Sequence, residues 1–321
     1  MTYDRYYYSI LPASDKPIYK TIYKGIQNFE TYIIIPKSTV SMQSIFQYVG
    51  LDNPHIFYVD FNEYNYSESF TNIVIHPTYW YTKPEMLEIN EKIQKVLKKM
   101  SVRISGDTEY KKEKSVHDLL VENVIYDMSA LQDIDKYRSR SNSILGVLFY
   151  KTAVCEGISK VTKMLLNLQD IKCIVANGTA NGEPHSWNIV KIEDEAYQLD
   201  VTWDINLSTK ENFRYDYFNL SDKEMWSDHY PNIKYPICNS NKHNYFYKNK
   251  LVAKNLLDIE KIIAFGRLQC KTFISFKYTG NNFENAVKTA VNTAASVNVF
   301  GGMHTISYST NKEQKICTIN F

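Results

Sequence analysis

The sequence predicts an α+β fold in which a helix that begins at Cys155 packs on an antiparallel sheet. Three observations predict it: an apolar stripe with helical spacing follows Cys155, three strand-like segments follow that stripe, and both flanks mix helical and strand-like patterns. The 321 residues suffice for a sizeable core in two or three structural units. We expect an N-terminal mixed α/β region at 1–104, the core at 105–240 and a small C-terminal α+β unit at 241–321.

The N-terminal region contains two strand-like runs and one amphipathic helix. Residues 31–36 and 55–61 are rich in Ile, Val, Phe and Tyr, which favours strands. Over residues 84–100 apolar side chains recur at mostly three-to-four spacing, with Pro84 at the start and two lysines at the end. We therefore expect this segment to be a helix packed on the core.

The core segment predicts two helices followed by three strands. Residues 109–127 carry one apolar stripe, and a second stripe follows Cys155. The predicted strands are 173–177, 185–192 and 196–203, of which the last two form a hairpin about Asp194. The Asn-, Lys- and Tyr-rich residues 235–250 are expected to be a linker. The C-terminal unit is predicted as helix 256–268, strand 271–278, helix 282–297 and strands 303–309 and 315–321.

Composition excludes several classes of function. With 37 basic and 35 acidic residues, the net charge of +2 gives no reason to propose a nucleic acid or an anionic membrane as partner. No stretch approaches the ~20 apolar residues of a membrane span. The first residues, MTYDRYYYSI, lack a signal-peptide pattern, so we expect a cytoplasmic protein. Oligomeric state stays open.

The five cysteines are odd in number and contain no CxxC pair. This pattern indicates neither a zinc ribbon nor a disulfide framework, and reduced thiols are expected. A metal site formed by Cys155 and His185 has little support because a second Cys/His pair is lacking. We expect neither a metal nor a cofactor.

Three short motifs carry nucleophile chemistry: AVCEG around Cys155, PHSWN around His185 and QLDVTWD around Asp200. A helix N-terminus favours the thiolate form of a cysteine, because its N–H groups are unpaired and its dipole end is positive. A histidine takes up the thiol proton, and a carboxylate orients the imidazole. The Cys155 N–H is the first oxyanion donor; the second is open, with Asn142 and Tyr150 as candidates.

The hairpin register raises a difficulty for this triad. About a turn at Asp194, His185 and Asp200 lie three residues out of register, or about 10 Å along the strands. A bulge or a skewed turn is needed to bring them together.

Neighbouring residues receive less specific interpretations. Asp204 competes with Asp200, whose motif position is favoured, and Trp187 and Trp203 are expected to be core residues and cleft walls. Glu156 is a first-turn acid without a catalytic role. Two pairs, His117 with Asp118 and Tyr126 with Asp127, are expected at the polar edge of a core-packed helix. The other four cysteines are ordinary thiols.

The segments AVCEGISKVTKMLL and PHSWNIVKIEDEAYQLDVTWD resemble the transglutaminase-like superfamily in its bacterial form. Residues 115–127, 215–229 and 52–60 are similar to segments that accompany this core. Two positions depart from the usual pattern, because Ala153 stands where a Gly is usual and Ile158 where an aromatic residue is common. The calcium sites and β-sandwich modules of animal transglutaminases have no counterpart.

The resemblance implies a papain-like fold with a Cys155–His185–Asp200 triad that acts on amides. The first hypothesis is an acyl-transfer enzyme: Cys155 attacks an amide of a protein or peptide, and water or an amine resolves the thioester. The alternative is a catalytically inactive binding or scaffold protein whose flanking units carry the function.

Overall fold

The computed structural model describes residues 5–296 and 306–321. The N-terminal region is a three-stranded antiparallel sheet, in the order β1-β3-β2, covered by helices. Its elements are α1 (Tyr6–Ile10), α2 (Lys16–Asn28), β1 (Ile33–Pro36), α3 (Met42–Asp52), β2 (Val59–Glu68) and β3 (Asn72–Tyr79). The strand predicted at 55–61 begins only at Val59 and runs on to Glu68. Tyr7 of α1 is buried, and its hydroxyl donates to the Val175 carbonyl of the core at 2.6 Å.

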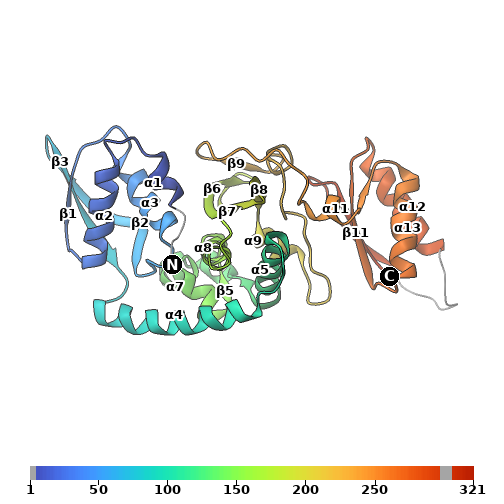
Figure 1. Ribbon diagram of the computed structural model, residues 1–321, viewed down its shortest axis with the longest axis horizontal. Helices are drawn as coiled ribbons and strands as arrows, with labels where there is room; N and C mark the ends of the chain where they lie inside the picture. The colour runs from blue at the N-terminus through green and yellow to red at the C-terminus, as the bar shows by residue number, and fades with distance from the viewer. Residues whose placement is uncertain (1–4, 297–305) are drawn as a thin grey trace.

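Helix α4 (Lys83–Arg103) connects this region to the core and runs beneath both (Figure 1). It corresponds to the helix predicted at 84–100. A capping box fixes its start, because Thr82 and Glu85 each bond the other's backbone N–H. The helix continues past the predicted lysines to Arg103, since Leu97 and Met100 extend its buried stripe.

The core packs one buried helix against a four-stranded antiparallel sheet in the order β8-β7-β6-β9. Helix α8 is almost wholly buried and lies against β6 and β7 (Figure 1). The elements of the core are α5 (Glu109–Asn123), β4 (Ile125–Tyr126), α6 (Met128–Gln132), α7 (Ile134–Ser141), the π-helix η1 (Gly146–Tyr150), β5 (Thr152–Ala153), α8 (Cys155–Asn167), β6 (Cys173–Ala180), β7 (Glu183–Ile192), β8 (Glu195–Leu199), α9 (Val201–Leu207), α10 (Asp222–Met225) and β9 (His229–Pro231).

Two predictions for the core are wrong in detail. The third predicted strand, 196–203, ends at Leu199, because the Asp200 side chain caps the new helix α9 by accepting from the Trp203 N–H. The predicted linker, 235–250, contains the short helix α11 (Tyr245–Lys248), and its Phe246 is 1% exposed. Asn244 holds this segment in place by capping α11 and donating to the Phe218 carbonyl.

The C-terminal unit is a four-stranded sheet, in the order β10-β11-β13-β12, with α12 and α13 packed on it (Figure 1). Its elements are β10 (Val252–Ala253), α12 (Leu256–Leu268), β11 (Phe273–Tyr278), α13 (Phe283–Ser296), β12 (Ser307–Asn311) and β13 (Ile316–Asn320). Residues 303–305 of one predicted strand and residue 297 of one predicted helix lie outside the described residues. The unit has its own hydrophobic cluster.

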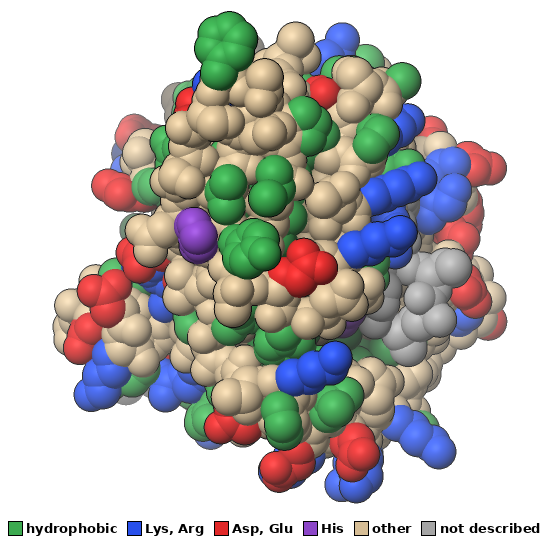
Figure 2. Space-filling model, turned by 90° about the vertical axis from the view of Figure 1, so that its left-hand side faces the viewer, with side chains coloured by type: hydrophobic (Ala, Val, Ile, Leu, Met, Phe, Trp, Pro, Cys, Tyr) green, Lys and Arg blue, Asp and Glu red, His purple; other side chains and the backbone are tan. Residues whose placement is uncertain are grey.

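The N-terminal region and the core, by contrast, share one hydrophobic cluster that runs from Leu11 to Phe218. The outer end of the N-terminal region shows hydrophobic side chains scattered among single charged ones (Figure 2). Tyr32, Ile34 and Phe70 are among the exposed hydrophobic residues of this region. Within the described residues, no helix combines the length and apolar character needed to cross a membrane.

Candidate active site

Cys155 is the first residue of α8 and is partly exposed. The two-stranded parallel pair β4–β5 positions it: Tyr126 pairs with Ala153, and the Asp127 N–H donates to the Ala153 carbonyl at 3.0 Å. The first N–H groups of a helix lack intrahelical acceptors, so the chain presents the Cys155 thiol beside a positive dipole end.

Gly157 brings the first turn of α8 close to the preceding loop. A Cβ atom at this position would lie 2.4 Å from the Ser141 carbonyl oxygen and 2.8 Å from that of Ser143. The Ser141 carbonyl also accepts the Val154 N–H at 3.2 Å. The loop backbone therefore fixes the position of the first turn of α8, and with it the position of Cys155.

His185 and Asp200 come together without a bulge, which was one of the two devices that we expected. The β7–β8 register is continuous from Ile192–Glu195 to Asn188–Leu199, which would place Asp200 opposite Trp187. The offset from His185 is thus two residues, or about 7 Å, instead of three. Because the chain leaves the strand at Asp200, its carboxylate turns toward β7, and Oδ2 accepts from His185 Nε2 at 2.6 Å.

Charge and burial act in opposite directions on this pair. Burial favours the neutral form of both groups, but the His185 imidazole and a second imidazole hold the pKa of Asp200 well below its usual range. For His185, burial alone would lower the pKa. The Asp200 carboxylate outweighs this effect and, together with Cys155, raises the pKa of His185 to about 10. Both shifts favour the charged forms, an imidazolium and a carboxylate, over the neutral pair.

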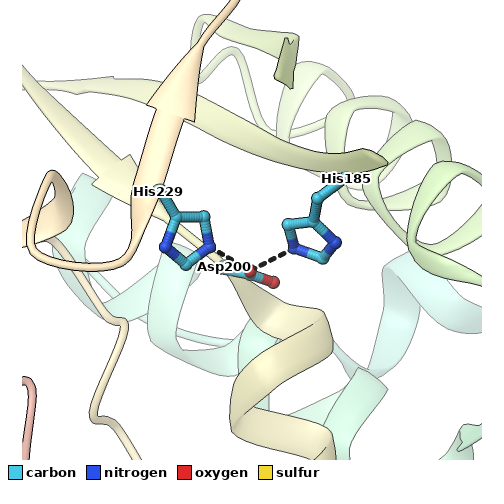
Figure 3. Close-up of side chains that lie close together, drawn as sticks. All are labelled: His185, Asp200 and His229. Carbon is cyan, nitrogen blue, oxygen red and sulfur yellow. Dashed lines mark hydrogen bonds and ion pairs between the residues drawn. The ribbon is translucent and has the colours of Figure 1, made fainter. Parts of the chain in front are cut away.

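The second imidazole belongs to His229, which the sequence interpretation did not single out. Its Nε2 lies 3.1 Å from Asp200 Oδ2, and its Nδ1 lies 2.5 Å from Asp228 Oδ1. His185 and His229 thus converge from two strands on one oxygen of Asp200 (Figure 3). His229 and Asp200 are both fully buried. No local pattern announces this contact, because β9 has only three residues and lies 29 positions from Asp200 along the chain.

Among the described residues, these three side chains also form a group that could hold a metal ion, since their ligand atoms lie within 4.8 Å of one another. A metal would need both Nε2 atoms unprotonated. Both of these atoms hydrogen-bond Asp200 Oδ2, and the pKa of each imidazole is raised, for His229 by Asp200 and Asp228 against the effect of burial. The arrangement suits proton-bearing rings better than metal ligands.

Cys155 and His185 line one cavity of about 760 Å³, a volume typical of ligand sites. The N-terminal region supplies part of its wall through Gln47, Gly50, Leu51, Phe61 and Asn62. Exposed side chains at its rim include Leu131, Ile134, Glu183 and Pro184. The cavity is therefore built jointly by the core and the N-terminal region.

The two tryptophans have different positions. Trp203 lines the cavity and lies against the ring of His229, with centroids 4.4 Å apart. Trp187 is 2% exposed, does not line the described cavity, and donates from Nε1 to Gln198 Oε1 at 2.7 Å. Trp187 is therefore a core residue, as expected, but the prediction that it is also a cleft wall is wrong, because its ring lies in the core behind His185.

The two candidates for the second oxyanion donor, Asn142 and Tyr150, differ in whether they line the cavity. Asn142 lines the cavity, but its amide donates to Glu156 Oε2 at 2.9 Å. Tyr150 is 58% exposed and is not among the described residues that line the cavity. Tyr126, which we expected at a helix edge, lies in the cavity wall. Burial raises its pKa, and the neighbouring Cys155 and Asp200 raise it further.

Two other acidic residues are engaged in ion pairs. Glu156 accepts from Lys160 Nζ at 2.6 Å, and this pair outweighs burial and lowers the pKa of Glu156. Asp204, the competitor of Asp200, instead bonds His117 Nε2 at 3.1 Å, and His117 Nδ1 bonds Asp118 at 3.1 Å. Burial raises the pKa of Asp204 to about 7. This second His–Asp group does not line the described part of the cavity.

Helix α8 begins at Cys155 and packs on an antiparallel sheet that bears His185, which is the α+β arrangement that the sequence predicted. The sequence profile of the transglutaminase-like superfamily matches residues 98–201, which include Cys155, His185 and Asp200. The chain therefore contains a transglutaminase-like core, as its motifs predicted.

Comparisons with curated proteins and with solved structures do not indicate a function for this chain. A search among curated proteins gave no match. One solved structure, described as the crystal structure of a TGase, is 18% identical to this chain, and the match covers 44% of this chain and 44% of that one with a TM-score of 0.33. This chain thus spans less than half of that structure, and the likeness carries no argument about function.

Proposed function

We propose that the protein is an acyl-transfer enzyme that attacks an amide of a protein or peptide with Cys155. The observation that carries the proposal is the His185–Asp200 hydrogen bond of 2.6 Å in a cavity that also contains the partly exposed Cys155 thiol. A protonated imidazole beside a cysteine favours the thiolate, which is the nucleophile.

In the proposed reaction the Cys155 thiolate adds to the carbonyl carbon, and the charge that develops on oxygen faces the start of α8. His185 then gives its proton to the leaving nitrogen, so that the C–N bond breaks and a thioester remains. Water or an amine next attacks the thioester while His185 accepts its proton. The thiolate leaves, and both side chains return to their starting states.

The cavity wall supports a peptide or amide substrate over a phosphate-bearing one. It contains five side-chain amides, Gln47, Asn62, Asn142, Asn177 and Asn232, together with apolar side chains. Among the described residues that line it, Lys160 is the only Lys or Arg, and its ammonium is already paired with Glu156 and the Asn142 carbonyl. This wall has amide donors and acceptors for a peptide, and its described residues include no free Lys or Arg for a phosphate-bearing acyl carrier.

The test combines labelling and turnover. Iodoacetamide should alkylate Cys155 at least tenfold faster than Cys270, which is exposed and serves as an internal control. Mixed unstructured peptides, incubated with the protein and biotinylated cadaverine, should be cleaved, deamidated or labelled, and Cys155→Ala should lose all three products. Equal reactivity of the two thiols, with no product that depends on Cys155, would favour the binding or scaffold alternative.

A further inference from the structure

The hydrogen bonds at Asp200 continue away from the cavity and into the C-terminal unit. Asp200 accepts from His229, His229 bonds Asp228, and Asp228 Oδ2 accepts from Gln314 Nε2 at 3.3 Å. Gln314 lies in the turn between β12 and β13 and is 2% exposed. A continuous series of buried polar contacts thus joins the C-terminal unit to the ring of His185.

His229 is held at both ring nitrogens, and two tryptophan rings lie close to it. Its Nδ1 is fixed by Asp228 and its Nε2 by Asp200, so the ring cannot turn without losing a charge-assisted hydrogen bond. The rings of Trp187 and Trp203 lie with their centroids 5.3 and 4.4 Å away. The backbone is fixed as well, because His229 pairs with Ala180 at the edge of the sheet. Such a ring is a rigid donor to Asp200.

The far end of the series is anchored by the C-terminal unit. The Gln314 amide donates to the Glu224 carbonyl at 3.1 Å and to Ser227 Oγ at 3.0 Å as well as to Asp228. Asp228 Oδ2 also accepts from the Tyr217 hydroxyl at 2.7 Å, and Asn311 of β12 donates to that hydroxyl at 3.3 Å. Both side chains from the unit therefore act on the carboxylate that holds His229.

We propose that His229 is a positioning residue that fixes the Asp200 carboxylate against His185, and that Gln314 of the C-terminal unit fixes His229 through Asp228. The inference rests on the proposed role of Asp200 in orienting His185. It makes the C-terminal unit a structural part of the site. A removable binding module would not need this buried contact.

The experiment measures the rate at which iodoacetamide alkylates Cys155, by mass spectrometry of the full-length protein, so that no substrate is required. Asp200→Asn defines the largest loss. His229→Leu should slow Cys155 at least tenfold, as the loss of a partner that orients a site residue does elsewhere. His229→Gln keeps a donor toward Asp200 and should stay within about threefold of the wild-type rate. Gln314→Leu should slow Cys155 roughly threefold.

Three controls separate positioning from general damage. Ser309→Ala removes a different contact of the C-terminal unit, the hydrogen bond from Arg214 at 3.0 Å, and should leave the rate unchanged. His243→Gln alters another buried histidine, one that pairs with Glu193 outside the cavity, and should also have no effect. The rate at Cys270 should be constant throughout.

The outcomes distinguish this proposal from the proposed function. If wild-type Cys155 is no faster than Cys270, the proposed function fails first. If it is fast and His229→Leu matches wild type, or His229→Gln is as slow as His229→Leu, the positioning role is overturned. Where His229→Leu does not fold, as judged by circular dichroism, Gln314→Leu decides: a wild-type rate contradicts the proposal, and a slowed rate with an unchanged Ser309→Ala supports it.

Discussion

Gly157→Ala tests whether the loop before α8 sets the position of the cysteine. In an ordinary helix this change is favourable, because Ala exceeds Gly in helix propensity by about 1 kcal/mol. Here the new methyl would lie 2.4 and 2.8 Å from two carbonyl oxygens, whereas ordinary contact begins at 3.4 Å. The loop or the helix must therefore move by about an ångström to accept it.

The expected loss of stability in Gly157→Ala follows from the groups that have to move. Forcing a methyl into a packed site costs typically ~1–3 kcal/mol. The Ser141 carbonyl is also the acceptor of the Val154 N–H, and weakening that hydrogen bond costs about 1 kcal/mol more. After the gain in propensity, Gly157→Ala should lower the free energy of unfolding by about 1–3 kcal/mol. It should also slow the alkylation of Cys155, which lies two residues away.

Urea titration followed by circular dichroism gives the free energy of unfolding. Gly266→Ala is the matched control, since it is also a buried glycine in a helix, but its close neighbour is a side-chain methyl, Ile274 Cδ1 at 2.8 Å. That methyl rotates away more easily than a backbone carbonyl, so Gly266→Ala should stay within about 1 kcal/mol of wild type. A Gly157→Ala protein as stable as wild type, with an unchanged Cys155, would refute the reasoning.

Two further predictions concern pH. The pKa of His185 is raised from 6.5 to about 10, so its contribution to stability is complete below pH 6.5 and is lost as the pH rises through about 10. Urea titrations should show that wild type loses its stability advantage over His185→Gln between pH 6 and 10.5. A constant difference in the free energy of unfolding would contradict this. Burial raises the pKa of Glu113 from 4.5 to about 8, and its Oε1 has no hydrogen-bond partner among the described residues. The stability that the neutral carboxyl gives is therefore complete below pH 4.5 and is lost as the pH rises from there through about 8. Glu113→Gln should be more stable than wild type by about 1 kcal/mol or more at pH 9, and a less stable variant there would show the assignment to be wrong.

Much of the core was predictable because its signals are local. The stripe after Cys155 specifies a helix by its period, and residues 185–192 are rich in Trp, Ile and Val, which favours a strand. A two-residue turn of Glu193 and Asp194, both in left-handed conformations, closes the hairpin. The sequence also held a usable signal for the place of Asp200, since Asp is a favoured N-cap. Residues 196–203 alternate between apolar and polar side chains, which suggested a strand, so the N-cap at Asp200 was not recognised.

The contacts that complete the site have no such signal. His229 reaches Asp200 from a three-residue edge strand, and Gln314 reaches Asp228 from 86 positions away along the chain. The period of two that places His185 and Trp187 on one face of β7 does not say which of them meets solvent. These features depend on how whole elements pack, which a single sequence does not display.

Because the N-terminal region forms part of the cavity wall, substitutions there can change the cavity without changing the residues around Cys155. Leu51 and Phe61 lie outside residues 98–201, the segment that carries the family resemblance, yet they face the same cavity as Cys155. Substitutions in α3 or β2 can therefore reshape what enters the cavity while the groups around the thiol stay constant. Related chains with the same three motifs need not accept the same partners, and a comparison restricted to the motifs would miss the difference.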